Sequence, residues 1–495
     1  MDRAVPPPSD HHQLTVPIHK TLAALLAAAA ALLAVPATAA AHGFFLTPSL
    51  PVPVWLFGVV AGLVVVGSFA AVGFMWRQPL LTERHWRPTR IAAGPQARVV
   101  LEMLAGALGV LILVLVIWSG REGSTQSLHT FATVWVFVIF WTGLPLLHVL
   151  LGDAFRAFNP WRAVGRLVGG AAALYVRPPA GQELRPLLAY PSWLGRWPAV
   201  AGVLGFVFLE LASSRTPAAI ADATIAYTVF TFAGMALFGT RAWIANGEAF
   251  SVYFNLFARI SAVETRDGRV GLRRPLSALV DLPPAPGTVA LVAVMVGSVS
   301  YDGASGRPWW QSTLREIMLA LQDLGLSPIA SEKWGSFIGI VLFCIGAGLV
   351  YYLGVLGMRA VTGGGSVAEL GRRFATTLVP IALAYLLAHY LTLLIVNGQN
   401  VIPAVSDPLG DGSSDWFGTA AVEPDPGTLS PEAFWYIQIS ALVAGHVAAV
   451  ALAHDLALQV FRRATDAVRS QLAMLLVMVG FTVFALWLLS EAAEL

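Results

Sequence analysis

Four ionisable side chains interrupt long apolar stretches of the chain, and their types suggest metal chemistry. They are Glu210, Asp302, His389 and His446. Ionisable side chains inside a membrane span are costly and usually mark function. Two carboxylates and two imidazoles suit zinc, manganese, cobalt or iron, and a metal-bound water is a usable nucleophile near neutral pH. These residues predict a divalent-metal site with Glu210, Asp302 and His389 in catalytic roles.

A fifth candidate ligand, His42, depends on how the N-terminus is processed. A polar segment ending at Lys20, an apolar run over 22–35 and the small residues 39–41 predict a signal peptide over 1–41. Cleavage after residue 41 would leave His42 at the mature N-terminus, where its amine and imidazole could chelate copper. Cleavage after residue 39 and an uncleaved anchor are the alternatives.

Each candidate also has a structural explanation. Glu210 and Asp302 could pair with Arg307 and Arg215, and a single histidine inside a helix is more often a hydrogen-bonded packing residue. The candidates share no fixed spacing, and we find no H-E-x-x-H, C-x-x-C, P-loop or G-x-S-x-G motif in a suitable context. Cys344 is the single cysteine, which excludes disulfides and thiolate clusters within one chain. The residue types leave both interpretations open.

The elements that must position these residues are transmembrane helices. Of 495 residues, 57% are hydrophobic and 12% are charged, about half the charged fraction of a soluble domain. Ten apolar stretches are long enough to cross a hydrocarbon core of about 30 Å. We therefore expect an all-α, polytopic transmembrane bundle of about ten helices over 42–495. The stretches are 54–76, 98–118, 131–151, 197–214, 220–243, 287–302, 335–358, 374–396, 433–455 and 470–490.

The arginines predict how the helices are oriented. If the mature N-terminus lies outside, the connections on the cytoplasmic side hold 23 arginines, and the external ones hold five basic residues. This is the asymmetry that the positive-inside rule requires. It predicts a multi-pass protein of the bacterial cytoplasmic membrane with both mature termini outside and an external acidic loop over 397–432. No run of Lys and Arg suggests nucleic-acid binding.

An internal duplication is visible at nearly constant spacing. The tetrapeptide GDAF at 152–155 recurs as GEAF at 247–250, and each is followed by Phe-Asn. The matches define repeat A over 128–217 and repeat B over 223–309, in parallel orientation. A two-fold axis along the membrane normal would relate two such copies.

The duplication makes two predictions about the candidate residues. Glu210 and Asp302 end corresponding helices of the two repeats, so they lie at equivalent depths and could face each other across the axis. The apolar residues of 250–260 recur with helical spacing, which is typical of a helix lying in the membrane interface. We interpret the GDAF and GEAF segments as structural elements of the cytoplasmic side.

Two segments resemble a known family. AHGFFLTPSLPVPVWLFGVVAGLVVVGSFAAV at 41–72 and NPWRAVGR at 159–166 are similar to bacterial, mainly actinobacterial, membrane proteins known as fenitrothion hydrolases. The resemblance covers about a tenth of the chain and supplies no catalytic motif. It implies a membrane-bound phosphoric triester hydrolase acting on a small-molecule organophosphate. Metal-assisted attack of water on phosphorus would then use Glu210, Asp302, His389 and His446.

Two other functions fit the same features. Parallel repeats, carboxylates and histidines within spans and a short sixth span with Gly297, Ser298 and Ser300 are usual for transporters or channels, here for metal ions or small anions. A non-catalytic subunit of a membrane complex is the third reading, in which Trp-rich outer loops dock a partner and the chain assembles as a homo- or hetero-oligomer. The three classes predict hydrolysis, solute flux and copurification respectively.

Overall fold

The computed structural model describes residues 54–491 apart from 82–85, 93, 126–129, 177–185, 214–215, 267, 364 and 462. All of them belong to the unit Thr47–Leu495. The predicted signal peptide, His42 and Arg215 lie outside the described residues, as does the first part of the segment 41–72.

Nine helices within these residues are long and apolar enough to cross a membrane. This confirms the predicted all-α polytopic bundle. They are α2 (Val54–Met75), α3 (Pro95–Glu122), the continuous α4 (Phe131–Thr133), η2 (Val134–Gly143) and α5 (Leu144–Leu151), then α9 (Pro217–Phe238), α13 (Thr288–Ser305), α15 (Pro328–Thr362), α17 (Val379–Ile395) with the turns before it, α19 (Pro431–Val460) and α20 (Ala464–Glu491).

The one predicted span that is not among these nine, 197–214, is a shorter apolar helix, α8 (Trp197–Leu211). Its 15 residues extend over about 22 Å, less than a hydrocarbon core of about 30 Å. The remaining short helices connect the long ones. They are α6 (Phe155–Phe158), α7 (Pro160–Val176), α10 (Thr240–Asn246), α11 (Ala249–Ala258), α12 (Ser277–Val280), α14 (Pro308–Asp323), α16 (Val367–Phe374), η3 (Ala375–Leu378), η4 (Asn397–Asn400), α18 (Val401–Ser406) and η5 (Pro426–Thr428).

The third span is a π-helix over most of its first half, η2. Pro145 lies one residue beyond the start of α5 and has no amide hydrogen to donate to the preceding turn, and the Leu144 amide reaches back to the Ile139 carbonyl. The Thr142 hydroxyl donates to the Val138 carbonyl at 2.5 Å. π-helical turns widen a helix locally and are frequent at functional sites.

A three-stranded antiparallel sheet was not expected from the sequence. Its order is β1 (Arg87–Ala92), β3 (Arg269–Leu272), β2 (Val263–Arg266). The β2–β3 hairpin turns at Gly268, whose φ of +78° favours glycine. The sheet joins the segment after α2 to the segment between α11 and α13.

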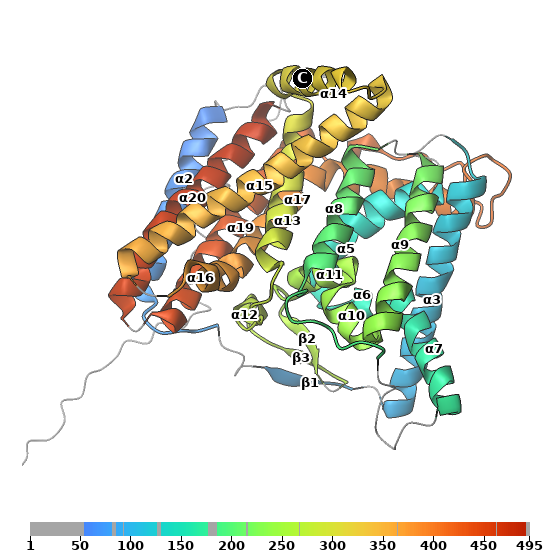
Figure 1. Ribbon diagram of the computed structural model, residues 1–495, viewed down its shortest axis with the longest axis horizontal. Helices are drawn as coiled ribbons and strands as arrows, with labels where there is room; N and C mark the ends of the chain where they lie inside the picture. Colours follow the sequence, from blue (N-terminus) through green and yellow to red (C-terminus); the bar gives the residue numbers. More distant parts are fainter. Residues whose placement is uncertain are drawn as a thin grey trace, which may run out of the picture. The chain divides into compact units, whose positions relative to one another are not determined.

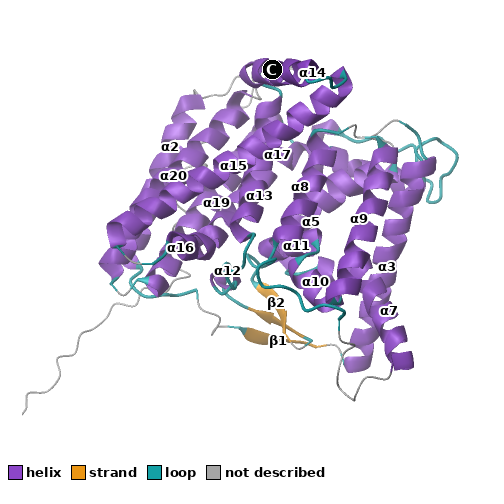
Figure 2. Cartoon of the chain, viewed as in Figure 1, coloured by secondary structure: helices purple, strands orange, loops and turns teal. Residues whose placement is uncertain are grey.

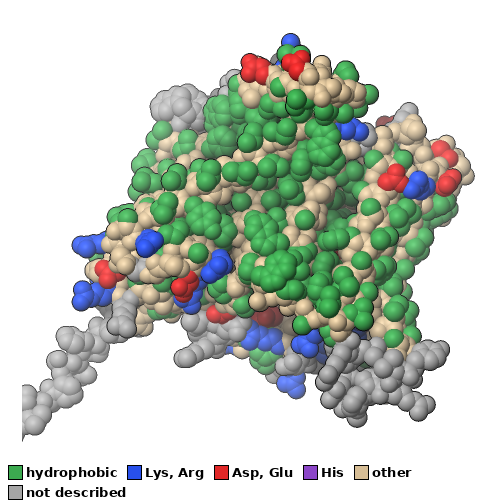
Figure 3. All heavy atoms as spheres, viewed as in Figure 1, with side chains coloured by type: hydrophobic (Ala, Val, Ile, Leu, Met, Phe, Trp, Pro, Cys, Tyr) green, Lys and Arg blue, Asp and Glu red, His purple; other side chains and the backbone are tan. Residues whose placement is uncertain are grey.

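The two ends of the helices differ in character. Figures 1 and 2 show α14 and the end of α20 at one end, and the sheet, α12 and α16 at the other; we call these the α14 end and the sheet end. Apolar side chains cover the helices between them, and Lys and Arg gather mainly toward the sheet end (Figure 3). Large apolar side chains such as Leu104 and Leu108 of α3 are exposed on the helices between the two ends. The chain is therefore a multi-pass protein of a lipid bilayer.

Candidate functional site

Two of the predicted site residues meet between α13 and α17. The Nε2 atom of His389 lies 2.8 Å from Oδ2 of Asp302, and the hydroxyl of Tyr390 donates to the same oxygen at 2.8 Å. Asp302 lies three residues before the last residue of α13, and His389 and Tyr390 are adjacent in α17. One carboxylate oxygen thus contacts an imidazole and a phenol hydroxyl that come from neighbouring positions of one helix.

Glu210 joins the same cluster from α8. Glu210 is buried, and its carboxylate interacts with the hydroxyl of Tyr390 and lies near the phenol of Tyr253 in α11. Tyr390 therefore links the carboxylates of Glu210 and Asp302, the residues that end corresponding helices of the two repeats. We call Glu210, Asp302, His389 and Tyr390 the polar cluster.

Close helix packing brings the cluster together. A Cβ atom on Gly297 of α13 would lie 2.5 Å from the Cα of Cys344 in α15, so this position needs glycine. Beyond the end of α13, the guanidinium of Arg307 donates to the carbonyls of Gly303 and Leu488, at 3.2 and 3.1 Å. These bonds fix the end of α13 against α20 and hold the backbone beside Asp302.

The cluster lies near the α14 end. Asp302 is about 21 Å along α13 from its first residue by the rise of a helix, and α14 begins three residues after α13 ends. The side chains of Asp302 and His389 are 17% and 32% exposed. The imidazole is thus partly exposed, whereas Glu210 is buried.

His446 lies deeper, on α19. Its Nδ1 donates to the carbonyl of Leu442 at 2.7 Å, and its ring centroid lies 6.3 Å from that of Tyr385, four residues before His389. The ring is fully buried, and its Nε2 has no hydrogen-bond partner among the described residues. The structure thus places His446 next to the turn below His389, with one nitrogen unsatisfied.

The predicted metal ligands are only partly brought together among the described residues. Among them, no group of three or more His, Cys, Asp or Glu side chains is placed to hold a metal ion. One oxygen of Asp302 already accepts two hydrogen bonds, from His389 and Tyr390. The remaining candidate ligand, His42, lies outside the described residues. A metal ion therefore stays a prediction from the residue types.

The duplicated segments contact each other reciprocally. The side-chain amide of Asn159 in repeat A donates to Glu248 of repeat B at 3.0 Å, and the amide of Asn255 in repeat B donates to Asp153 of repeat A at 3.1 Å. Each Phe-Asn motif thus binds the acid of the other copy. This exchange is what two copies related by a two-fold axis would make, and it supports the predicted duplication.

The prediction that 250–260 lies in the membrane interface is wrong. Its first nine residues belong to α11, where Phe250, Tyr253, Phe254 and Phe257 are all buried against neighbouring helices. The helical spacing of apolar residues was real, but it does not tell a lipid-facing stripe from one that faces protein. Glu248 caps this helix by accepting from the Phe250 and Ser251 amides.

A second polar group at the sheet end has a structural role. The carboxylate of Asp455 accepts from the Leu80 and Leu81 amides, at 2.5 and 3.1 Å, and Nε2 of His454 lies 2.8 Å from the Trp76 carbonyl. These bonds tie the segment after α2 to α19. His454 thus pairs the Trp76 carbonyl next to the end of α2, and Asp455 pairs two amides of the segment that follows.

The acidic loop 397–432 folds on itself and on the start of α4. The Ser406 hydroxyl donates to Asp415, and the Phe417 amide donates to the Ser406 hydroxyl at 2.9 Å. The Pro408 carbonyl accepts from the Phe131 amide at the start of α4. The loop is an ordered cover on the α3–α4 connection.

Sequence reasoning found three members of the cluster and missed the fourth. Tyr390 is adjacent to His389 in the sequence, but only the rotation of α17 shows that both side chains face α13. Comparisons with protein-family models, with curated proteins and with solved structures each find no match to this chain. The polar cluster, together with the two segments that resemble fenitrothion hydrolases, is therefore the basis for any statement about function.

Proposed function

We propose that this protein is a proton-coupled transporter for metal ions or small anions, and that the polar cluster carries the proton. The observation that carries the proposal is the shared oxygen of Asp302, which is 2.8 Å from both the His389 imidazole and the Tyr390 hydroxyl. Chains of acids and histidines within membrane spans are typical of proton relays in pumps and transporters.

The cluster can hold one proton in more than one place. When His389 is neutral, its Nε2–H can donate to Asp302; when it is protonated, the two groups form an ion pair. The Tyr390 hydroxyl contacts both Asp302 and Glu210, so it connects this pair to Glu210. Uptake of one proton from the α14 end would thus change the charge between three helices, α8, α13 and α17, that pack against one another.

A continuation toward the sheet end is available along α17 and α19. Tyr385 lies one helical turn below His389, and its ring is beside the unsatisfied imidazole of His446. His446 is the next group on this line that could accept a proton. We propose that it is the internal station of the relay.

The orientation follows from the basic residues. The arginine-rich connections and the Lys and Arg side chains near the sheet end (Figure 3) support a cytoplasmic location for that end. The α14 end, the C-terminus and the polar cluster would then face the outside of a bacterial cytoplasmic membrane. Protons would enter from the outside, which is the direction favoured by a normal proton gradient.

Proteoliposomes provide the test. The full chain would be reconstituted with a pH-sensitive dye inside, and an inward gradient of Mn²⁺ or of phosphate would be imposed. We expect solute entry to be accompanied by a change of internal pH, and both signals to fall to those of empty liposomes in Asp302→Asn and His389→Gln. Asp222→Asn is the matched control, because Asp222 pairs with Arg121 at the surface of α9 and α3. Proton movement that is unchanged in both cluster variants would refute the relay.

Hydrolysis of organophosphorus triesters is the second candidate. Asp302 orients the imidazole of His389, an arrangement in which a histidine can remove a proton from water as a general base. The resemblance of 41–72 and 159–166 to fenitrothion hydrolases favours the same reaction. Paraoxon hydrolysis by the purified protein that is lost in His389→Gln would support the enzyme. The same assay would be run after chelation and after return of zinc, manganese or cobalt. Solute flux without hydrolysis would support the transporter.

A further inference from the structure

An apolar cavity of about 420 Å³ lies between α3 and helices of the two repeats. Its walls come from α3, η2, α8 and α9 together with the short helices α6, α7 and α11. The helices α13 and α17, which carry Asp302, His389 and Tyr390, do not contribute to this lining. The cavity is therefore distinct from the polar cluster, and its volume is that of a site for a small molecule.

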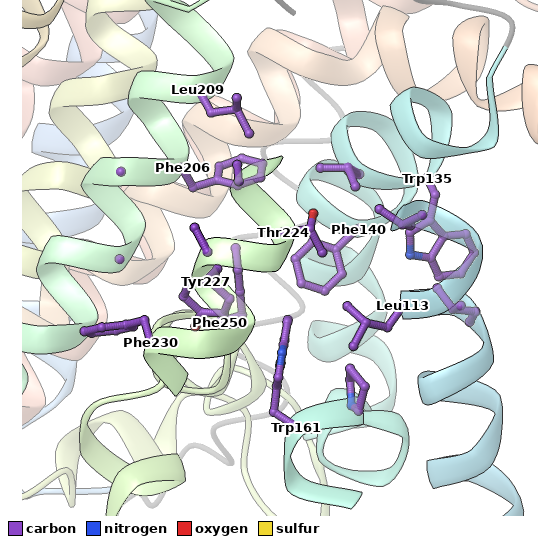
Figure 4. A pocket seen from close by; sticks show the side chains of 18 of the residues that line it. Leu113, Trp135, Phe140, Trp161, Phe206, Leu209, Thr224, Tyr227, Phe230 and Phe250 are labelled. Atoms are coloured by element: carbon purple, nitrogen blue, oxygen red, sulfur yellow. The ribbon is translucent and has the colours of Figure 1, made fainter. Parts of the chain in front are cut away.

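Aromatic rings form a large part of the wall. Nine of the lining residues are Phe, Tyr or Trp, and Figure 4 shows Trp135 and Phe140 of η2, Trp161 of α7 and Phe206 of α8 around one space. Several rings are held edge-on to one another; the centroids of Phe140 and Phe250, for example, lie 4.7 Å apart at 73°. Their positions are fixed by packing, so the ring faces and edges that border the cavity are preformed.

Three of the polar side chains in the wall are already engaged in hydrogen bonds. The Thr224 hydroxyl donates to the Ile220 carbonyl at 2.7 Å, and the Tyr227 hydroxyl donates to Glu248. The Trp161 indole N–H donates to the Thr228 hydroxyl at 3.0 Å. The wall therefore favours an occupant without charge and with little need for hydrogen bonds.

The mouth of the cavity opens at membrane depth. The exposed lining residues include Ala201 and Gly205 of α8 and Ala226 and Phe230 of α9. Gly205 is about 12 Å from the first residue of α8 by the helix rise, and Ala226 and Phe230 are near the middle of α9. An occupant would enter from the hydrocarbon layer between α8 and α9.

We propose that this cavity binds a flat, uncharged aromatic or conjugated molecule drawn from the bilayer. Ring faces and edges give aromatic ligands an attraction beyond the burial of apolar area, which a saturated acyl chain does not receive. Gly205 keeps one wall open: a Cβ atom built on it has no heavy atom within 4 Å. A large side chain at this position would occupy the ligand's space without a clash at its first atom.

The experiment uses the full chain in nanodiscs of saturated phosphatidylcholine, with 1-aminoanthracene as the probe. We expect saturable fluorescence enhancement, and binding weaker by about tenfold or more in Gly205→Phe. Ala201→Leu, at the mouth, is a second variant that should weaken binding in the same direction. Gly346→Phe on α15 is the matched control, because a Cβ atom there also meets nothing within 4 Å.

The outcomes separate the ligand class from the site. Equal probe affinity in wild type, Gly205→Phe and Ala201→Leu, with all three folded by their melting curves, would overturn the site. Saturable binding that excess palmitic acid abolishes would overturn the aromatic class and assign the cavity to an acyl chain. Loss of binding in Gly346→Phe as well would show a general effect of inserted rings and would also overturn the site.

Discussion

The reciprocal contacts of the duplicated acids predict unequal effects of the same change in the two copies. Glu248→Gln and Asp153→Asn each replace a carboxylate by an amide of nearly the same shape. The residue Glu248 is fully buried, and its carboxylate receives four hydrogen bonds. The Asp153 side chain is 34% exposed and receives one, from Asn255 at 3.1 Å.

The expected magnitudes follow from the number of donors. In Glu248, one oxygen accepts from the Tyr227 hydroxyl and the Phe250 amide, and the other accepts from Asn159 and from the Ser251 amide. A glutamine keeps one oxygen, so two donors face its NH₂ group in either orientation. Two lost bonds to a charged group, at about 1.5–3 kcal/mol each, give a decrease of about 3–6 kcal/mol in the free energy of unfolding.

The change at Asp153 should have little effect. An asparagine there can keep its oxygen toward Asn255 and loses only the charge, which at an exposed site is worth about 1 kcal/mol or less. The neighbouring His148 adds little, because its Nδ1 faces the Leu144 carbonyl at 2.7 Å while its Nε2 accepts from the Phe155 amide at 3.1 Å. That pattern of bonds belongs to a neutral imidazole.

Equilibrium unfolding of the purified variants in mixed detergent–SDS micelles would measure both values. We expect Glu248→Gln to unfold at clearly lower SDS fraction and Asp153→Asn to coincide with the wild type. Glu248→Asp, which keeps the charge but shortens the side chain, should fall between them. Equal destabilisation by Glu248→Gln and Asp153→Asn would refute the reasoning from donor count and burial.

Three further predictions concern other polar groups. Asp302→Ala removes the acceptor of two hydrogen bonds and should lower the free energy of unfolding by about 2–4 kcal/mol in the same assay, whereas Asp302→Asn should lower it less. Hydrogen bonds from Ser406 and from backbone amides hold the pKa of the Asp415 carboxyl below its ordinary value. The ionised carboxylate therefore stabilises the loop above about pH 4, and this stabilisation is lost as the pH falls through the lowered pKa. Hydrogen exchange of the loop, corrected for intrinsic rates, should rise in acid, and Asp415→Asn should remove this pH dependence. Asp222→Asn should change the free energy of unfolding by less than about 1 kcal/mol, because both Asp222 and Arg121 are about half exposed, and a larger change would show that this ion pair is not a surface contact.

Counting residues along predicted helices was sufficient to bring two distant acids and a histidine near one another. The apolar lengths give each helix its extent, and alternation of direction gives Glu210, Asp302 and His389 similar depths. The contribution of Tyr390 could not be predicted, because it depends on the rotation of α17 about its axis. The β1–β3 pairing was equally inaccessible, since it joins Arg87 to Leu272 through contacts that no local pattern specifies.

The burial of α11 shows the main limit of hydrophobic patterns in a membrane protein. In water, an apolar stripe on a helix indicates which side faces the core, because the other side must be polar. In lipid, apolar side chains are accepted on every side, so the stripe of Phe250, Tyr253, Phe254 and Phe257 fits an interface and a protein core equally. Only Glu248, a charge that must be paired when buried, distinguishes the two.

The position of α8 between the cavity and the polar cluster allows a last prediction. Phe206 and Leu209 face the cavity and Glu210 contacts Tyr390, but the wall at Phe206 is fixed by Trp141, whose ring centroid is 4.4 Å away. A ligand changes the properties of a second site only if its contacts differ between two states of the protein. Because Trp141 holds Phe206 in place, we expect the wall of the cavity to keep one conformation. We therefore expect 1-aminoanthracene to bind Asp302→Asn with the wild-type affinity at pH 6 and at pH 8. A dependence on pH in the wild type that Asp302→Asn removes would show that α8 moves, and by linkage that an occupant of the cavity changes proton binding by the cluster.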